Sequence, residues 1–191
     1  MRERVFHFKQ FSISHNKCAM KVGTDGVLLG AWCNTTENGN CLDIGTGSGL
    51  IAMMVAQRNQ SALITAIDIE ENAAIEAAEN FEKCPWAARL ESKHIDFKTF
   101  AENSNIKFDS IISNPPFFIN SLHSPDNNRT KARHTDSLTF NDLIVYSAKI
   151  LSDDGCLSII TPSDTEEVIT NIALDAGLCI TRKTYVHPTT D

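Results

Sequence analysis

Cys41-Leu42-Asp43-Ile44-Gly45-Thr46-Gly47-Ser48-Gly49 is the stretch that decides the fold of this 191-residue chain. Its first four residues form a short apolar run typical of a buried strand, and the three glycines allow the backbone to turn tightly and to approach a ligand closely. Residues 49–57 then carry apolar side chains at helical spacing. A strand, a glycine-rich turn and a helix in this order are typical of α/β folds that bind a ligand beyond the strand.

Strand and helix patterns alternate along the rest of the chain. Further strands are expected at residues 62–69, 89–95, 108–113, 156–161 and 178–186, and further helices at 72–82, 143–151 and 163–176. Most of these strands are continuous in apolar residues, which is typical of a parallel sheet that is buried on both faces. We therefore predict an α/β fold in which helices cover both faces of a doubly wound, mostly parallel sheet.

Two helix starts and one turn carry signatures of their own. Thr139 is followed three residues later by Asp142, and Ser163 by Glu166, so each pair forms a candidate capping box. Residues 153–155, Asp-Asp-Gly, are typical of a turn. We expect the two helices to begin at these Thr and Ser residues, and the strand at 156–161 to follow the turn.

Length and composition favour a single domain over residues 1–191, since 42% apolar residues can bury a substantial core. Within it we distinguish an amino-terminal segment, 1–35, from a core, 36–191. No apolar run reaches the length of a membrane span and the first residues lack the apolar core of a signal peptide, so we expect a cytoplasmic protein without membrane contact. The six cysteines include no C-x-x-C pair, and we expect neither a disulfide framework nor a metal site.

In open α/β sheets, ligands bind at the carboxyl ends of the strands. The predicted strand tips present Asp43, Asp68 and Asp96, and three carboxylates are a poor site for the pyrophosphate of a dinucleotide. They suit a ligand with a cationic centre, an amino group and a ribose diol, which describes S-adenosylmethionine. Asp68 would accept the ribose hydroxyls and Asp96 the adenine amino group, with Phe97 packed on the adenine. Asp43 would face the amino-acid end or order the turn, and each acid alone could equally be a turn or cap residue.

Asn114-Pro115-Pro116-Phe117 follows the strand at 108–113. Two prolines cannot continue a sheet ladder, so the strand must end in a rigid tip. The side-chain oxygen of Asn114 and the carbonyl of Pro115 could each accept one N–H of a planar amine, and Phe117 could stack on its ring. This arrangement would raise the electron density on the amine beside a methyl donor without requiring a general base.

The charge distribution bears on the substrate. The net charge of −7 argues against indiscriminate nucleic-acid binding, but residues 1–23 carry +4 and the remainder −11. A second basic cluster, Arg129, Lys131 and Arg133 with His134, follows the Asn-Pro-Pro-Phe tip. These side chains are either solvated surface charges or contacts to RNA phosphates.

Three segments, at residues 21–32, 42–50 and 111–117, resemble class I S-adenosylmethionine-dependent methyltransferases, whose fold is Rossmann-like. Residues 9–11, 18–21 and 85–87 resemble more narrowly the bacterial tRNA1(Val) (adenine(37)-N6)-methyltransferases. The resemblance implies a donor-closing segment at 21–26, with Lys21 and Thr24, and a tRNA partner with no obligate protein partner. It also implies that a final strand hairpin is missing, because the chain ends at Asp191.

The same resemblance assigns roles by position. Gly45, Gly47 and Gly49 would form the main donor turn, Asp68 with Ile69 the ribose contact, Asp96 with Phe97 the adenine contact, and residues 114–117 the catalytic tip, with Asn114 also touching the donor. The aromatic residue is Phe117 where the best-known members have tyrosine, a change that stacking tolerates.

The resulting function is methyl transfer to the N6 amine of an adenine in tRNA, at position 37 of the anticodon loop of tRNA1(Val). Two alternatives stay open: methylation of a glutamine amide in a protein, and a donor-binding module that contacts RNA without turnover. A dehydrogenase is a more distant alternative, since the spacing is G-x-G-x-G and not G-x-G-x-x-G.

Overall fold

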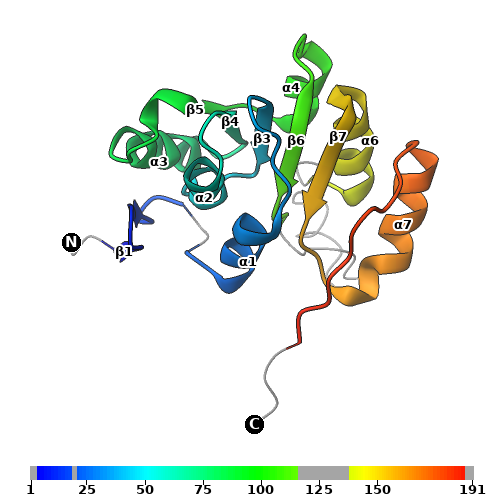
Figure 1. The fold of residues 1–191 in the computed structure, drawn as a ribbon, viewed down its shortest axis with the longest axis horizontal. Helices are drawn as coiled ribbons and strands as arrows, with labels where there is room; N and C mark the ends of the chain where they lie inside the picture. The colour runs from blue at the N-terminus through cyan, green and yellow to red at the C-terminus, as the bar shows by residue number, and fades with distance from the viewer. Residues whose placement is uncertain (1–3, 19–20, 116–137, 188–191) are drawn as a thin grey trace, which may run out of the picture.

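The computed structural model describes residues 4–18, 21–115 and 138–187. Its elements follow one another along the chain as shown in Figure 1. They are β1 Val5–His7, β2 Ser12–Ser14, α1 Thr24–Trp32, β3 Asn40–Ile44, α2 Leu50–Arg58, β4 Leu63–Asp68, α3 Glu71–Glu82, η1 Ala87–Arg89, β5 Leu90–His94, α4 Phe97–Asn103, β6 Phe108–Ser113, α6 Phe140–Ile150, β7 Leu151–Ile159, η2 Ser163–Thr165 and α7 Glu166–Asp175.

The main sheet has the strand order β5-β4-β3-β6-β7, and every pair in it is parallel. The chain moves outward from β3 to β5, returns past β3, and continues with β6 and β7 on the other side. The strand order therefore reverses between β3 and β6, where α/β sheets bind their ligands. The registers of Ile44 with Ile67 and with Ser113 bring the carboxyl ends of β4, β3 and β6 side by side. The predicted doubly wound parallel sheet is confirmed.

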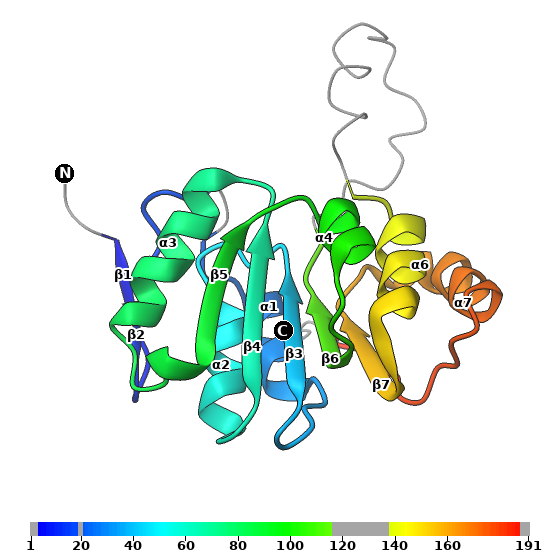
Figure 2. The same ribbon diagram turned by 90° about the horizontal axis from the view of Figure 1, so that it is seen from above.

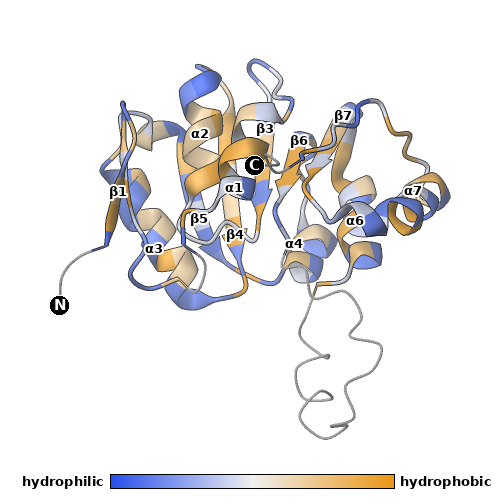
Figure 3. Ribbon diagram, turned by 90° about the horizontal axis from the view of Figure 1, so that it is seen from below, coloured by the Kyte–Doolittle hydropathy of each residue, from blue (hydrophilic) through white to orange (hydrophobic). Residues whose placement is uncertain are grey.

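Alternate strand residues enter two separate cores, one on each face of the sheet. Cys41 and Ile112 pack with α1, α2 and α3, whereas Leu42 and Ile111 pack with α4 and α6. This alternation follows from the two-residue period of a strand. The two groups of helices lie on opposite sides of the sheet in Figure 2, and Figure 3 colours much of α1 as hydrophobic. Among the residues that the structure describes, no helix is both long and apolar enough to cross a membrane.

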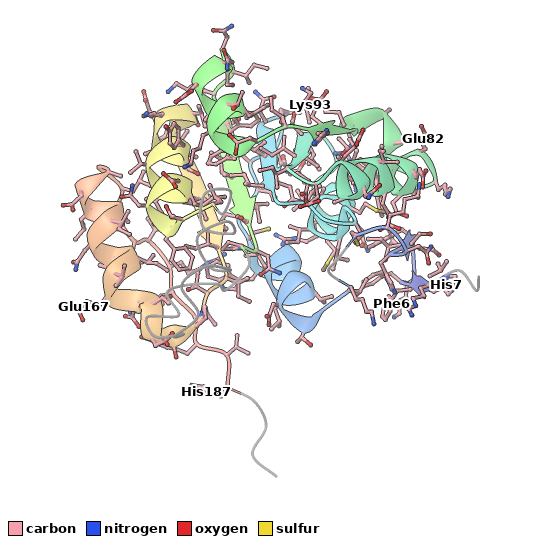
Figure 4. The ribbon with its side chains drawn as sticks, turned by 180° about the vertical axis from the view of Figure 1, so that it is seen from behind. Phe6, His7, Glu82, Lys93, Glu167 and His187 are labelled. Atoms are coloured by element: carbon pink, nitrogen blue, oxygen red, sulfur yellow. The ribbon has the colours of Figure 1, made fainter. Side chains whose placement is uncertain are left out.

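The amino-terminal strands β1 and β2 form a separate antiparallel hairpin that packs beside α3. Figure 4 shows Phe6 and His7 of β1 at the same side of the molecule as Glu82, the last residue of α3. The hairpin is thus attached to the outer helix of one face and contributes nothing to the main sheet.

The helix start predicted at Thr139 is confirmed, because its side-chain oxygen accepts the Asp142 N–H at 3.0 Å and its hydroxyl donates to the Asp142 carboxylate at 2.7 Å. The box at Ser163 is wrong. Pro162 precedes a 3-10 turn, η2, and the Thr165 hydroxyl donates to the Pro162 carbonyl at 2.7 Å. Helix α7 therefore begins only after Thr165.

Two strand predictions were also inaccurate. Strand β7 begins at Leu151, and residues 153–155 form an irregularity inside it, where the register passes from Phe108–Leu151 to Ser110–Cys156. A Cβ on Gly155 would lie 2.8 Å from the Phe108 carbonyl oxygen, which explains the glycine there.

The expected strand at 178–186 is absent from the described sheets. A strand requires a neighbour that satisfies its backbone groups. This segment instead attaches through side chains: Thr184 accepts the Trp32 indole N–H at 3.0 Å, the Arg182 guanidinium lies 3.8 Å from the centre of the Trp32 ring, and Tyr185 donates to Glu166 at 2.6 Å.

Candidate active site

The glycine-rich stretch forms a tight turn at residues 45–49, here called the donor turn, directly after β3. Gly45, Gly47 and Gly49 have φ values of +69°, +57° and +85°, a region that favours glycine. A Cβ built on Gly45 or Gly47 would meet no atom within 4 Å, so one side of the turn is open to a ligand. A Cβ on Gly49 would lie 2.5 Å from the Phe81 ring, so this glycine is needed for packing as well.

Asp43 lies beneath the donor turn and is 1% exposed. Its Oδ2 accepts the Thr46 hydroxyl at 2.6 Å and the Ala52 N–H at 3.2 Å. Its Oδ1 is buried and has no hydrogen-bond partner among the described residues. Burial raises the pKa of Asp43 to about 6, and the negative charge of Asp68 adds to this rise. The hydrogen bonds from Thr46 and Ala52 lower the pKa and oppose it. Asp43 therefore orders the turn through Oδ2, and its Oδ1 could still accept a hydrogen bond from a ligand.

Asp68 ends β4 and connects that strand to the donor turn. Its Oδ2 accepts the Gly47 N–H at 2.8 Å, and its Oδ1 accepts the Glu70 N–H at 2.9 Å. Asp68 is 9% exposed, and the neighbouring Ile69 is 48% exposed. Each oxygen of a carboxylate can accept more than one hydrogen bond, so Asp68 can still receive the hydroxyls of a ribose beside the turn.

Asp96 is the cap of α4, where its Oδ1 accepts the Thr99 N–H at 2.9 Å and the Thr99 hydroxyl at 3.1 Å. These are the contacts of a helix cap, which is the alternative role that the sequence left open for Asp96. Phe97 is 4% exposed and packs edge-on to Tyr146 in the core of that face. Both residues follow β5, two strands from β3, so they lie at the same edge of the sheet as the donor turn.

Asn114 follows the last residue of β6, next to the tip of β3. The Ser113 hydroxyl donates to the Ile44 carbonyl at 2.9 Å and ties the two tips together. The Asn114 Oδ1 is buried without a hydrogen-bond partner among the described residues, and Pro115 is buried. A buried amide oxygen without a partner costs free energy unless a ligand supplies a donor.

Lys21 and Thr24 are both exposed, and Thr24 begins α1. Helix α1 packs on α2, where a Cβ on Gly26 would lie 3.1 Å from Leu50 and one on Gly30 would lie 2.8 Å from Met54. The segment that leads into α1 is therefore fixed beside the helix that follows the donor turn. Pro116, Phe117 and the basic residues Arg129, Lys131 and Arg133 lie outside the described residues.

Three polar residues beside the donor turn were not singled out from the sequence. They are Ser113, at the end of β6, and Glu76 and Asn80, which face the donor turn and the amino-terminal segment from α3 and are each 1% exposed. Helical spacing could have found the last two, because Ala73, Ala77 and Phe81 mark the same face as the buried one. A polar side chain on such a face must have partners.

Comparisons with known proteins agree with this geometry. Residues 18–170 match the family model described as "Methyltransferase small domain". The chain is 45% identical over 191 residues to a protein of Parabacteroides distasonis, covering 100% of this chain and 80% of that protein. It is 38% identical over 187 residues to one of Escherichia coli, covering 97% and 76%. Both are named tRNA1(Val) (adenine(37)-N6)-methyltransferase. This chain belongs to their methyltransferase family.

Solved methyltransferase structures share the fold at low sequence identity. A SAM-dependent methyltransferase from Agrobacterium tumefaciens has a TM-score of 0.65 at 13% identity and covers 92% of this chain and 58% of its own. TrmN from Thermus thermophilus has a TM-score of 0.56 at 18% identity, covering 77% and 40%. The predicted class I methyltransferase fold is confirmed.

Proposed function

We propose that this methyltransferase uses S-adenosylmethionine to methylate the N6 amine of an adenine in tRNA, at position 37 of the anticodon loop of tRNA1(Val). The main support is the side-chain Oδ1 of Asn114, which is buried beside the donor turn without a hydrogen-bond partner among the described residues. It lies where the strand order reverses and can accept an N–H of the substrate amine. The names of relatives at 38–46% identity support the tRNA substrate.

The residues around the donor turn fit S-adenosylmethionine, which supplies an electrophilic methyl group on a sulfonium. Asp43 Oδ1 would accept from the amino-acid end, and Asp68 would accept the ribose hydroxyls. The open side of Gly45 and Gly47 allows close approach of the ligand to the backbone. Asp96 and Phe97 are the adenine contacts in this proposal, and Ile69 flanks the ribose.

The catalytic tip acts on the substrate amine. An exocyclic amine is a weak nucleophile because its lone pair is delocalised into the ring. Asn114 Oδ1 and the Pro115 carbonyl each accept one N–H, which raises the electron density on nitrogen and turns its lone pair toward the donor. Because Ser113 fixes this tip to β3 at 2.9 Å, the acceptors are in place before the substrate arrives. Pro116 maintains the rigid tip and Phe117 stacks on the target base in this proposal.

The amino-terminal segment, 1–35, faces the RNA in this proposal. Arg4 and Lys9 are exposed on it and carry positive charge in a protein with a net charge of −7. Arg129, Lys131 and Arg133 would contact further phosphates. A loop adenine is already partly unstacked, so its extrusion costs less than in a duplex. The proposed tRNA substrate implies that the protein acts in the cytoplasm.

The test is transfer of labelled methyl groups to tRNA1(Val) transcripts that carry either adenine or guanine at position 37, followed by nucleoside analysis. We expect N6-methyladenosine only with adenine, and a loss in kcat of about 10²–10³ for Asn114→Ala. Asn103→Ala, at an exposed asparagine that ends α4, is the matched control and should retain full activity. Unchanged N6-methyladenosine formation by Asn114→Ala would contradict the catalytic role. Methylation of protein glutamine in place of tRNA would overturn the substrate.

A further inference from the structure

Two buried polar residues of α3, Glu76 and Asn80, hold the amino-terminal segment against this helix. Glu76 is 1% exposed, and its carboxylate accepts three successive backbone N–H groups, from Asn16 at 2.5 Å, Lys17 at 3.0 Å and Cys18 at 2.8 Å. Successive N–H groups that converge in this way form a nest for an anion. Here the anion is supplied by the protein itself.

Asn80, one helical turn later, reaches both the amino-terminal segment and the donor turn. Its Oδ1 accepts the Ser14 N–H at 2.9 Å, and its Nδ2 donates to the carbonyls of Ser14 at 2.9 Å and Ser48 at 2.8 Å. Ser48 lies between Gly47 and Gly49 in the donor turn. One amide side chain therefore fixes two segments that are far apart in the sequence.

Two further contacts reinforce the connection. The thiol of Cys18 lies against Glu76 and Ser48: burial, with a hydrogen bond to the Glu76 carboxylate, raises the pKa of Cys18 to about 12. The next residue of α3, Phe81, packs against Gly49, where a Cβ would lie 2.5 Å from its ring. Helix α3 is thus the common support for residues 14–18 and for the donor turn.

We propose that Glu76 and Asn80 are positioning residues for the methyl donor: they fix residues 14–18 and the donor turn to one helix and so deliver residues 21–24 to the donor. Lys21 follows Cys18 by three positions, so an anchor at Cys18 limits where residues 21–24 can lie. This inference rests on donor binding in the proposed function and is independent of which RNA is methylated.

Glu76→Gln and Asn80→Asp test the proposal with limited change in shape. Gln at 76 keeps one acceptor oxygen but loses the charge, and its amide group opposes the N–H groups of the nest. Asp at 80 keeps the acceptor for Ser14 but cannot donate to Ser48. Glu79→Gln is the matched control, because Glu79 lies on the same helix and its carboxylate, 46% exposed, forms an ion pair with Lys17 at 2.5 Å.

Donor affinity is measured by calorimetry at a temperature where circular dichroism finds every variant folded. We expect Glu76→Gln and Asn80→Asp each to weaken S-adenosylmethionine binding at least fivefold and to raise the KM for S-adenosylmethionine by a similar factor. Their kcat should stay within twofold of that of the unmodified protein. Glu79→Gln should bind within twofold of the unmodified protein. Folded Glu76→Gln and Asn80→Asp proteins that bind the donor normally would overturn the proposal, since a purely structural role changes only the melting temperature.

Hydrogen exchange on the unmodified protein tests the same point without substitutions. Donor binding should slow the exchange of the amide protons of residues 16–18, and equal exchange with and without donor would also overturn the proposal. Failure of the unmodified protein to bind S-adenosylmethionine at all would instead refute the proposed function, so the two failures are distinguishable.

Discussion

Replacement of Asp43 by Asn should separate the stability of the protein from its affinity for the methyl donor. Asp43 is 1% exposed, and burial raises its pKa from 3.8 to about 6. A raised pKa in the folded state means that the protonated form is favoured there. The stability that this preference contributes is fully present below pH 4 and is lost as the pH rises through 6. The ionised form therefore destabilises the protein without donor at neutral pH.

The magnitude follows from the two pKa values. A rise from 3.8 to about 6 corresponds to ~3 kcal/mol between pH 3 and pH 8. Asn cannot ionise. The free energy of unfolding of Asp43→Asn, minus that of the unmodified protein, should therefore rise by this amount from pH 3 to pH 8. Donor binding should respond oppositely, because a cationic donor favours the carboxylate. With a pKa of about 6, apparent donor affinity should fall about tenfold from pH 7 to pH 5.

Urea unfolding and donor calorimetry at several pH values measure both effects. We expect Asp43→Asn to bind the donor more weakly at pH 7 and with little dependence on pH. If the unmodified protein binds the donor equally at pH 5 and pH 7, or if the variant retains the same pH dependence, Asp43 is not the group that titrates. Either result would show that the unpaired Oδ1 of Asp43 does not face the methyl donor.

Four further substitutions, one of them a control, test local packing, hydrogen bonding and helix capping. Gly49→Ala adds a Cβ 2.5 Å from the Phe81 ring at a φ of +85°, so it should destabilise the protein by about 2–5 kcal/mol and weaken binding of the methyl donor. The control is Gly177→Ala, at a φ of +79° with no atom within 4 Å, which should cost only about 1–2 kcal/mol and leave donor binding intact. Equal losses of stability for the two variants in urea unfolding would contradict this. Ser113→Ala removes the 2.9 Å hydrogen bond to Ile44 and should cost about 1 kcal/mol, with kcat falling more than the donor KM rises; a normal kcat in steady-state assays would count against the positioning of the tip. Thr139→Ala removes the cap of α6 and should lower stability by about 1 kcal/mol and Tm by about 2–4 °C without affecting kcat, and an unchanged melting curve would show that the cap is dispensable.

Local patterns in the sequence predicted most of the main sheet. The strand at 108–113 was placed at its observed limits, and the helix start at Thr139 was correct. These features depend on side chains that are neighbours along the chain, since periodicity and capping act over a few residues. The strand expected at 178–186 was wrong, because pairing depends on a distant partner that no local pattern reveals.

By itself the sequence determined the fold class, the family and the positions of the donor turn and the Asn-Pro-Pro tip, because glycine and proline restrict their own backbone. Only the tertiary structure decided which polar groups are buried with partners and which without. Asn16 and Glu76 are 60 residues apart, and Ser113 and Ile44 are 69 apart, yet each pair shares a hydrogen bond. The raised pKa of Asp43 likewise arises from burial beneath a turn. Such environments exist only once distant segments pack together, because desolvation depends on everything that surrounds a group.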